Sequence, residues 1–178
     1  MPEFIKRRLP ARNDIFLALS VATLLIFTWE LRSLFFNAPA FLLSYTAGQI
    51  LSITAYMLGV ALLETLAVML TVIVLAVILP CVVLRDRFSC KASFLFIALA
   101  VVSIQLQFTM SNQPRISYLA GKLFLAFILW LAPVLLVQFI PRFRTFILDL
   151  FDRLTIFSYI YLPLGVLSLL VMVVRLIW

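Results

Sequence analysis

The chain of 178 residues is 66% hydrophobic and only 12% charged. A soluble globular domain is about half apolar and about a quarter charged. Because this chain has too few polar side chains to cover its own surface, its composition excludes an ordinary soluble protein and predicts an integral membrane protein. The net charge of +7 is then explained by basic residues flanking membrane spans, and it does not indicate nucleic-acid binding.

Backbone hydrogen bonding predicts the fold class. In the hydrocarbon region every N–H and C=O must be paired within the protein, which leaves α-helices or a closed β-barrel. Barrel strands alternate apolar and polar residues, whereas residues 66–79 and 166–174 form continuous apolar runs. The sequence therefore predicts a single all-α membrane domain over residues 1–178.

Several residue types that enzymes and metal proteins need are scarce. The chain has no histidine, and its four glycines stand too far apart for a phosphate-binding loop. Cys81 and Cys90 alone cannot form a zinc site, and a cytoplasmic position for them argues against a structural disulfide. No nucleophile with an adjacent base is recognisable, so we expect no catalytic residues, no metal and no cofactor.

The first predicted span covers residues 14–36. It follows a basic N-terminal segment and lacks the small-residue cleavage site of a signal peptide, so it is predicted to be an uncleaved helix. Pro39 is expected to end the loop after it.

Residues 40–84 can be interpreted in two ways, since one helix over this segment would be about 65 Å long. Two spans are one alternative. The other is an interfacial helix over residues 40–56 followed by one span over residues 57–79. Polar residues spaced along one edge of the first part favour the interfacial helix; they are Tyr45, Gln49, Ser52 and Tyr56.

Three further spans are predicted over residues 91–108, 118–140 and 156–176. Residues 141–155 mix arginines and aspartates with phenylalanines, which is typical of a second amphipathic interfacial helix. The predicted architecture is thus a five-helix transmembrane bundle with two interfacial helices.

The distribution of basic residues predicts the orientation, with the N-terminus in the cytoplasm and the C-terminus outside. The cytoplasmic flanks then hold ten basic residues: Lys6, Arg7, Arg8, Arg12, Arg85, Arg87, Lys91, Arg142, Arg144 and Arg153. The outer side holds four: Arg32, Arg115, Lys122 and Arg175. This asymmetry obeys the positive-inside rule, and a sixth span within residues 40–84 would spoil it.

Polar residues near the outer ends of the predicted spans are the candidate functional site. Glu64 and Lys122 are expected roughly 8–10 Å below the outer surface, at a depth where they could form an ion pair. Gln105, Gln107, Glu30 and Arg32 fall at similar height. They form either a polar pocket for a headgroup, solute or peptide, or a structural ion pair with side chains that reach the headgroups. The structural interpretation is the commoner, but Glu64 is too short to reach water easily.

The layout resembles the N-terminal membrane module of lipoteichoic-acid-synthase-like and related sulfatase-superfamily proteins. The resemblance covers the whole chain and rests on topology and on Leu79-Pro80 before Arg85-Asp86-Arg87-Phe88. It implies five spans, a cytoplasmic N-terminus and interfacial helices. Because the sequence ends at Trp178 without the external hydrolase domain, the resemblance implies a detached membrane module or a partner subunit, and it transfers no catalytic or metal residue.

The sequence therefore predicts a non-enzymatic accessory or scaffolding subunit of a membrane protein assembly. The alternative is a small transporter or lipid-handling protein that uses the pocket around Glu64 and Lys122. Expected partners are membrane lipids and another membrane protein or a second copy of the chain, with no nucleic acid. The expected location is the bacterial inner (plasma) membrane.

Overall fold

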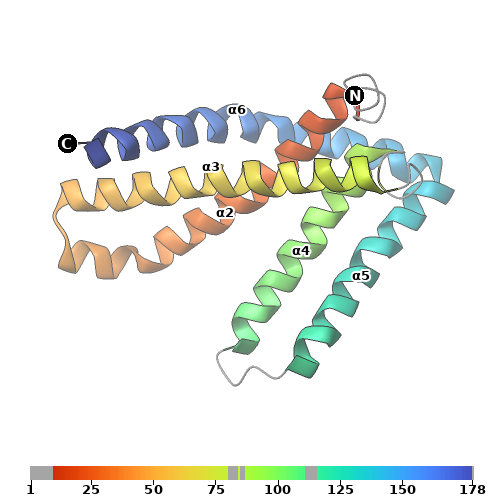
Figure 1. Ribbon diagram of the computed structural model, residues 1–178, viewed down its shortest axis with the longest axis horizontal. Helices are drawn as coiled ribbons and strands as arrows, with labels where there is room; N and C mark the ends of the chain where they lie inside the picture. Colours follow the sequence, from red (N-terminus) through yellow and green to blue (C-terminus); the bar gives the residue numbers. More distant parts are fainter. Residues whose placement is uncertain (1–9, 80–83, 85–86, 111–115, 178) are drawn as a thin grey trace. The chain divides into compact units, whose positions relative to one another are not determined.

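The protein is almost entirely helical in a computed structural model that describes residues 10–79, 84, 87–110 and 116–177 (Figure 1). The helices of this part of the chain are α2 (Arg12–Ser44), α3 (Ala47–Ile78), α4 (Phe88–Met110), α5 (Ile116–Phe139) and α6 (Pro141–Ile177). All five are long and apolar enough to cross a membrane. The predicted all-α class and the five apolar helices of spanning length are confirmed, as expected of a multi-pass membrane protein.

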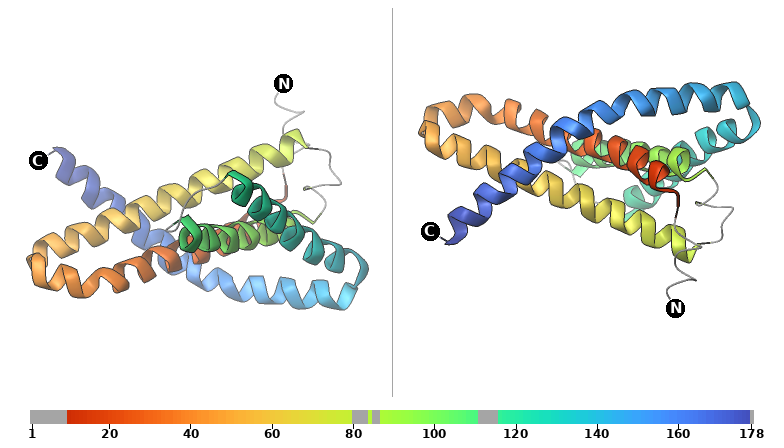
Figure 2. Two further views of the ribbon diagram at one scale, coloured as in Figure 1. Left: turned by 90° about the horizontal axis from the view of Figure 1, so that it is seen from below. Right: turned by 90° about the horizontal axis from the view of Figure 1, so that it is seen from above.

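Helices α2 and α3 form an antiparallel hairpin whose turn lies where one helix was predicted over residues 40–56 (Figures 1 and 2). Helix α2 continues through Pro39 to Ser44, because a membrane helix tolerates a proline. The Gln49 side-chain carbonyl accepts hydrogen bonds from the backbone N–H and the hydroxyl of Thr46, at 2.9 and 3.1 Å. Thr46 and Gln49 have the spacing of a capping box, and this short motif starts α3 at Ala47. Which part of α3 lies in the membrane and which in the interface stays a prediction.

Helix α6 runs without a break through the boundary predicted between residues 141–155 and 156–176. A single non-helical residue, Ile140, separates it from α5, and the backbone N–H of Arg144 donates to the Ile140 carbonyl. No proline or glycine stands near residue 155 to end the helix. The first four turns of α6 are thus continuous with the spanning part. Their position in the membrane interface stays a prediction.

The helices fall into two length classes. At 1.5 Å per residue, α4 and α5 are about 35 Å long, close to the thickness of the hydrocarbon core of a bilayer. Helices α2, α3 and α6 are about 50, 48 and 55 Å long. Each long helix must therefore tilt or extend beyond the hydrocarbon.

The chain divides into two compact units. Unit 1 contains Met1–Ala18 and Ile73–Arg153, and unit 2 contains Leu19–Val72 and Leu154–Trp178. That the whole chain forms one membrane domain stays a prediction.

In unit 1, α4 and α5 lie side by side as an antiparallel pair (Figures 1 and 2). Two long-range hydrogen bonds join the start of α4 to the second half of α5. The Trp130 indole N–H donates to the Lys91 carbonyl at 3.1 Å, and Arg87 donates to the Val137 carbonyl at 2.9 Å. The first turns of α6 join this unit through Phe151, whose ring packs edge-on against Phe94.

In unit 2, buried side chains of α2 and α3 pack with α6. The core contains Phe27, Leu58, Ala61 and Leu62. The Phe27 ring stacks on Tyr161 with centroids 5.1 Å apart. Gly165 brings α6 close, since a Cβ there would lie 3.0 Å from both Leu62 Cβ and Phe27 Cζ. Small residues at such contacts let membrane helices approach closely.

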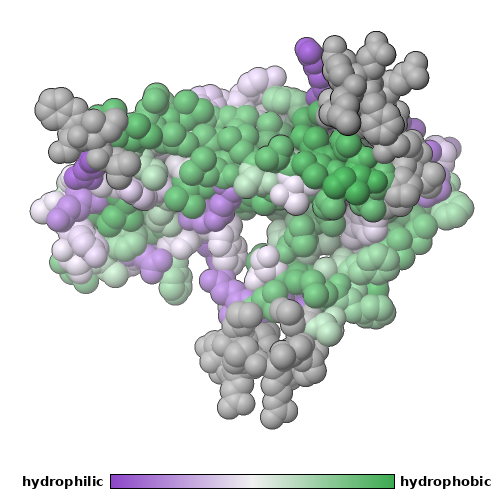
Figure 3. All heavy atoms as spheres, in the orientation of Figure 1, coloured by the Kyte–Doolittle hydropathy of each residue, from purple (hydrophilic) through white to green (hydrophobic). Residues whose placement is uncertain are grey.

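The outward face of α6 in unit 2 is apolar. Figure 3 shows hydrophobic residues gathered along α6 and α3. The exposed α6 residues include Val166, Leu167, Leu170, Val171 and Val174. A surface of this kind is stable against lipid acyl chains and would be costly in water.

We expect the substitution Gly165→Leu to lower the free energy of unfolding by about 1–3 kcal/mol, because the new side chain has no space between Leu62 and Phe27. Thermal unfolding in mild detergent measures the loss. Gly121→Leu is the matched control, since a Cβ at Gly121 meets nothing within 4 Å. Equal melting temperatures for the two variants would contradict the close packing of α6.

Candidate functional site

The six polar residues singled out from the sequence fall into two groups of three. Unit 1 contains Gln105, Gln107 and Lys122, whereas unit 2 contains Glu30, Arg32 and Glu64. The predicted pair of Glu64 with Lys122 has one member in each unit, and it stays a prediction.

The polar pair of unit 1 joins α5 to α4. The Lys122 ammonium donates a hydrogen bond to the Gln105 side-chain carbonyl at 2.9 Å, and both side chains are half-buried. Lys122 is six residues from the start of α5 and Gln105 is five residues from the end of α4, so each lies roughly 8–9 Å along its helix from the connecting loop. The amide stabilises the ammonium but does not neutralise it, so the site keeps a positive charge.

The acidic pair of unit 2 consists of Glu30 on α2 and Glu64 on α3. The two helices form one hairpin within unit 2. Glu30 is half-buried and Glu64 is exposed. A carboxyl group on an apolar membrane helix is costly, so each of them favours a cation or a hydrogen-bond donor beside it.

Glu64 lies deeper along its helix than the sequence suggested. With α3 starting at Ala47, Glu64 is 17 residues from the start and 14 from the end, near the middle of the helix. The exposed residues one to two turns away on the same face are Val60, Ala67 and Thr71. The Thr71 hydroxyl is satisfied by the Ala67 carbonyl at 2.8 Å. Glu64 is thus a carboxylate in the middle of an otherwise apolar, exposed stripe.

The other two candidates are less constrained. The Arg32 guanidinium lies over the Trp29 ring, 5.2 Å from its centroid, a cation–π contact within α2. Gln107 is exposed near the end of α4. Both arrangements are compatible with side chains at a membrane surface.

A basic cluster in unit 1 was missed by the sequence analysis. Arg87 lies just before α4 and Arg144 lies in the first turn of α6, both in unit 1, where the Cys90 thiol is buried. Arg87 adopts a left-handed conformation, with φ of 60°, from which it reaches the Val137 carbonyl. No sequence signal predicts this bond, because it joins residues 50 positions apart. Cys81 lies outside the described residues.

Among the described residues, no group of three or more His, Cys, Asp or Glu side chains is placed to hold a metal ion. Comparisons with protein-family models, with curated proteins and with solved structures find no match to this chain. Inference about function therefore depends on the arrangement of the polar groups.

We expect Gln105→Leu to lower the free energy of unfolding by about 1 kcal/mol, because the Lys122 ammonium loses its acceptor. The double variant Gln105→Leu, Lys122→Met should lose less than the sum of the two single variants, since it removes both polar groups. Chemical or thermal unfolding in detergent completes this double-mutant cycle. Gln107→Leu serves as the control, and additive losses would show that the bond contributes nothing.

Proposed function

We propose that the protein is a non-enzymatic subunit of a membrane protein assembly, and that the exposed face of α3 around Glu64 contacts another membrane protein. The observation that supports this most directly is the exposed carboxylate of Glu64 near the middle of a long apolar helix. An acidic side chain at the centre of a membrane span costs about 2.5–3.5 kcal/mol when it faces lipid. A partner helix that supplies a lysine, an arginine or a hydrogen-bond donor removes this cost.

The neighbours of Glu64 suit such a contact. Ala67 is small, and Thr71 uses its hydroxyl within its own helix, so a second helix can approach this face closely. The apolar outward face of α6 is instead suited to lipid.

The rival proposal is a small transporter or lipid-handling protein with a pocket around Glu64 and Lys122. It is favoured by two carboxyl groups on the α2–α3 hairpin, Glu30 and Glu64, since an acidic residue within a membrane helix often marks an ion or proton pathway. Both proposals need the Glu64 carboxylate, but only the first needs a second protein.

The orientation that we propose has the N-terminus in the cytoplasm, in a bacterial inner membrane. With five spanning helices, the turn at Tyr45 and Thr46 faces outside and the turn at Ile140 faces the cytoplasm. The basic residues then follow the positive-inside rule. The first turns of α6 lie in the cytoplasmic interface, and the hairpin turn with the start of α3 lies in the outer one.

We expect Glu64→Gln to reduce the partner protein that co-purifies with the tagged chain in mild detergent by at least about fivefold, because the charged contact is lost. Mass spectrometry of the purified complex measures this ratio. Asp149→Asn is the matched control, since it removes one exposed carboxylate in unit 1. Wild-type protein that purifies without any protein partner would sink the proposal and favour the pocket. If Glu64→Lys and Lys122→Glu each lower the stability of the protein and the double exchange restores it, the two residues form an ion pair within the chain.

Cysteine labelling tests the orientation. In a chain with Cys81 and Cys90 replaced by serine, we expect Gly48→Cys to react with a membrane-impermeant maleimide on intact cells. Arg142→Cys should react only after the membrane is opened. Both positions are exposed, and a Cβ at Gly48 meets nothing within 4 Å. The reverse labelling pattern would invert the topology.

A further inference from the structure

Three exposed arginines gather at one end of unit 1. Arg87 directly precedes α4, and Arg142 and Arg144 lie in the first turn of α6. Arg87 donates to the Val137 carbonyl at 2.9 Å, and Val137 lies in the last turn of α5, a few residues before Arg142 and Arg144, so the three arginines lie near the same end of the unit. We call these three residues the basic end.

In the part of the chain that the structure describes, the first turn of α6 contains no acidic residue to compensate its two arginines. Asp14, in the first turn of α2, belongs to the same unit. The acceptor of Arg87 is the carbonyl of Val137, which carries no charge. The other charged groups of this part of α6 lie one to three turns further along; they are Asp149, Asp152 and Arg153.

The basic residues at the start of α6 also oppose the usual preference of a helix. The N-terminal end of a helix carries partial positive charge and is stabilised by anions, whereas α6 has no acidic residue in its first turn and two arginines there. Such an arrangement is destabilising unless an anion lies nearby. The arginines therefore favour an anionic ligand at this end of unit 1.

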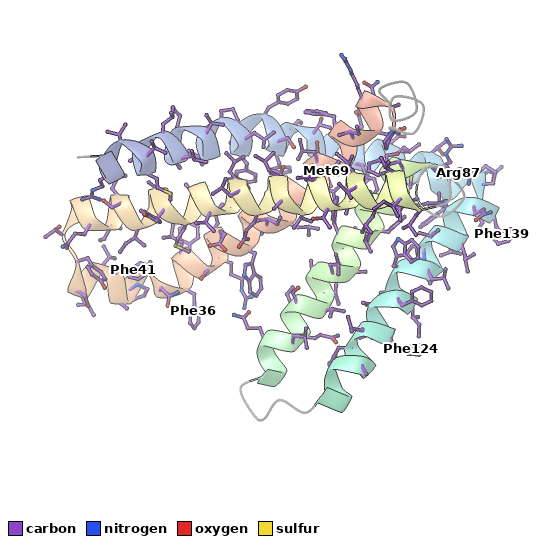
Figure 4. The ribbon with its side chains drawn as sticks, viewed as in Figure 1. Phe36, Phe41, Met69, Arg87, Phe124 and Phe139 are labelled. Carbon is purple, nitrogen blue, oxygen red and sulfur yellow. The ribbon has the colours of Figure 1, made fainter. Side chains whose placement is uncertain are left out.

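Exposed apolar side chains accompany the arginines and indicate where that anion comes from. Phe139 is 77% exposed and Phe146 is 64% exposed, with Ile140 between them in the sequence. Figure 4 shows Phe139 at the end of α5 near Arg87. Bulky apolar groups beside arginines are typical of a protein surface at the membrane interface, with acyl chains on one side and headgroups on the other.

We propose that the basic end binds the phosphate of an anionic phospholipid in the adjacent leaflet. The planar guanidinium donates paired N–H groups that match phosphate oxygens. The bond to the Val137 carbonyl uses one N–H group of the Arg87 guanidinium, which has five, so others can donate to the lipid. The acyl chains of the lipid then lie against Phe139 and Phe146. This site is independent of the Glu64 face and of any protein partner.

Native mass spectrometry of the full chain, released from mild detergent micelles doped with phosphatidylglycerol or phosphatidylcholine, tests the site. We expect the wild-type chain to retain phosphatidylglycerol preferentially. The double variant Arg142→Gln, Arg144→Gln should bind it roughly 25-fold more weakly, at about fivefold for each arginine near an anionic surface. The variant Arg142→Lys, Arg144→Lys keeps the charge and should retain most of the binding.

Arg175→Gln is the matched control, because Arg175 is an exposed arginine in the last turn of the same helix. It should leave retention of phosphatidylglycerol unchanged. Equal retention of the two lipids by the wild-type chain would overturn the proposal without any variant. Equal loss of binding in the Arg175→Gln control and in the Arg142→Gln, Arg144→Gln variant would overturn it too, by showing a general effect of net charge.

Discussion

Every backbone polar group of a membrane-embedded chain has to find its partner inside the protein, and this constraint shapes most of the structure. It explains why the described chain is nearly all helix, and why Pro39, Pro133 and Pro163 lie within helices without ending them. At helix ends, where backbone groups lack a partner within the helix, side chains form hydrogen bonds with them. The Gln49 side chain accepts from the Thr46 N–H at the start of α3, and Arg87 donates to the Val137 carbonyl in the last turn of α5. Side-chain hydroxyl groups follow the same constraint. The Thr65 hydroxyl donates a hydrogen bond to the Ala61 carbonyl of its own helix, so this donor is paired in apolar surroundings.

Helix packing in unit 2 follows from the weakness of hydrophobic association in lipid. Acyl chains are as apolar as leucine side chains, so close contact and shape decide which helix faces meet. The buried positions of α3 recur every three or four residues, so they lie along one face of the helix; they include Leu58, Ala61, Thr65, Met69 and Val72. Because Gly165 has no side chain, α6 can pack closely against Leu62 of α3. The aromatic stack of Phe27 on Tyr161 adds an oriented contact that a purely aliphatic seam would lack.

The sequence predicted what depends on composition and length, and it missed what depends on local motifs and tertiary contacts. Continuous apolar runs predicted the helical class and the five long apolar helices. The capping box of Thr46 and Gln49 was readable in the sequence, but the polar stripe around Gln49 favoured a separate interfacial helix. For the candidate site, the sequence placed Lys122 and Gln105 at similar height on either side of one short connection, and the structure joins them by a hydrogen bond. The depth of Glu64 in the membrane stays a prediction; α3 begins ten residues before the predicted span.

The polar side chains of the candidate site differ in whether they have a hydrogen-bond partner within the chain. Lys122 has its acceptor in Gln105, so this pair needs no external ligand to exist in the membrane. Glu64 is exposed near the middle of α3, a helix long and apolar enough to cross a membrane. A carboxylate there is costly in lipid alone, and this cost is the ground for proposing a partner protein at the Glu64 face. The arginines of the basic end are positively charged, unlike Glu64, and lie beside exposed phenylalanines. They therefore suit a different ligand. Because the two proposed sites differ in charge and lie in separate units, we propose two different ligands for them, a protein at the Glu64 face and a lipid at the basic end.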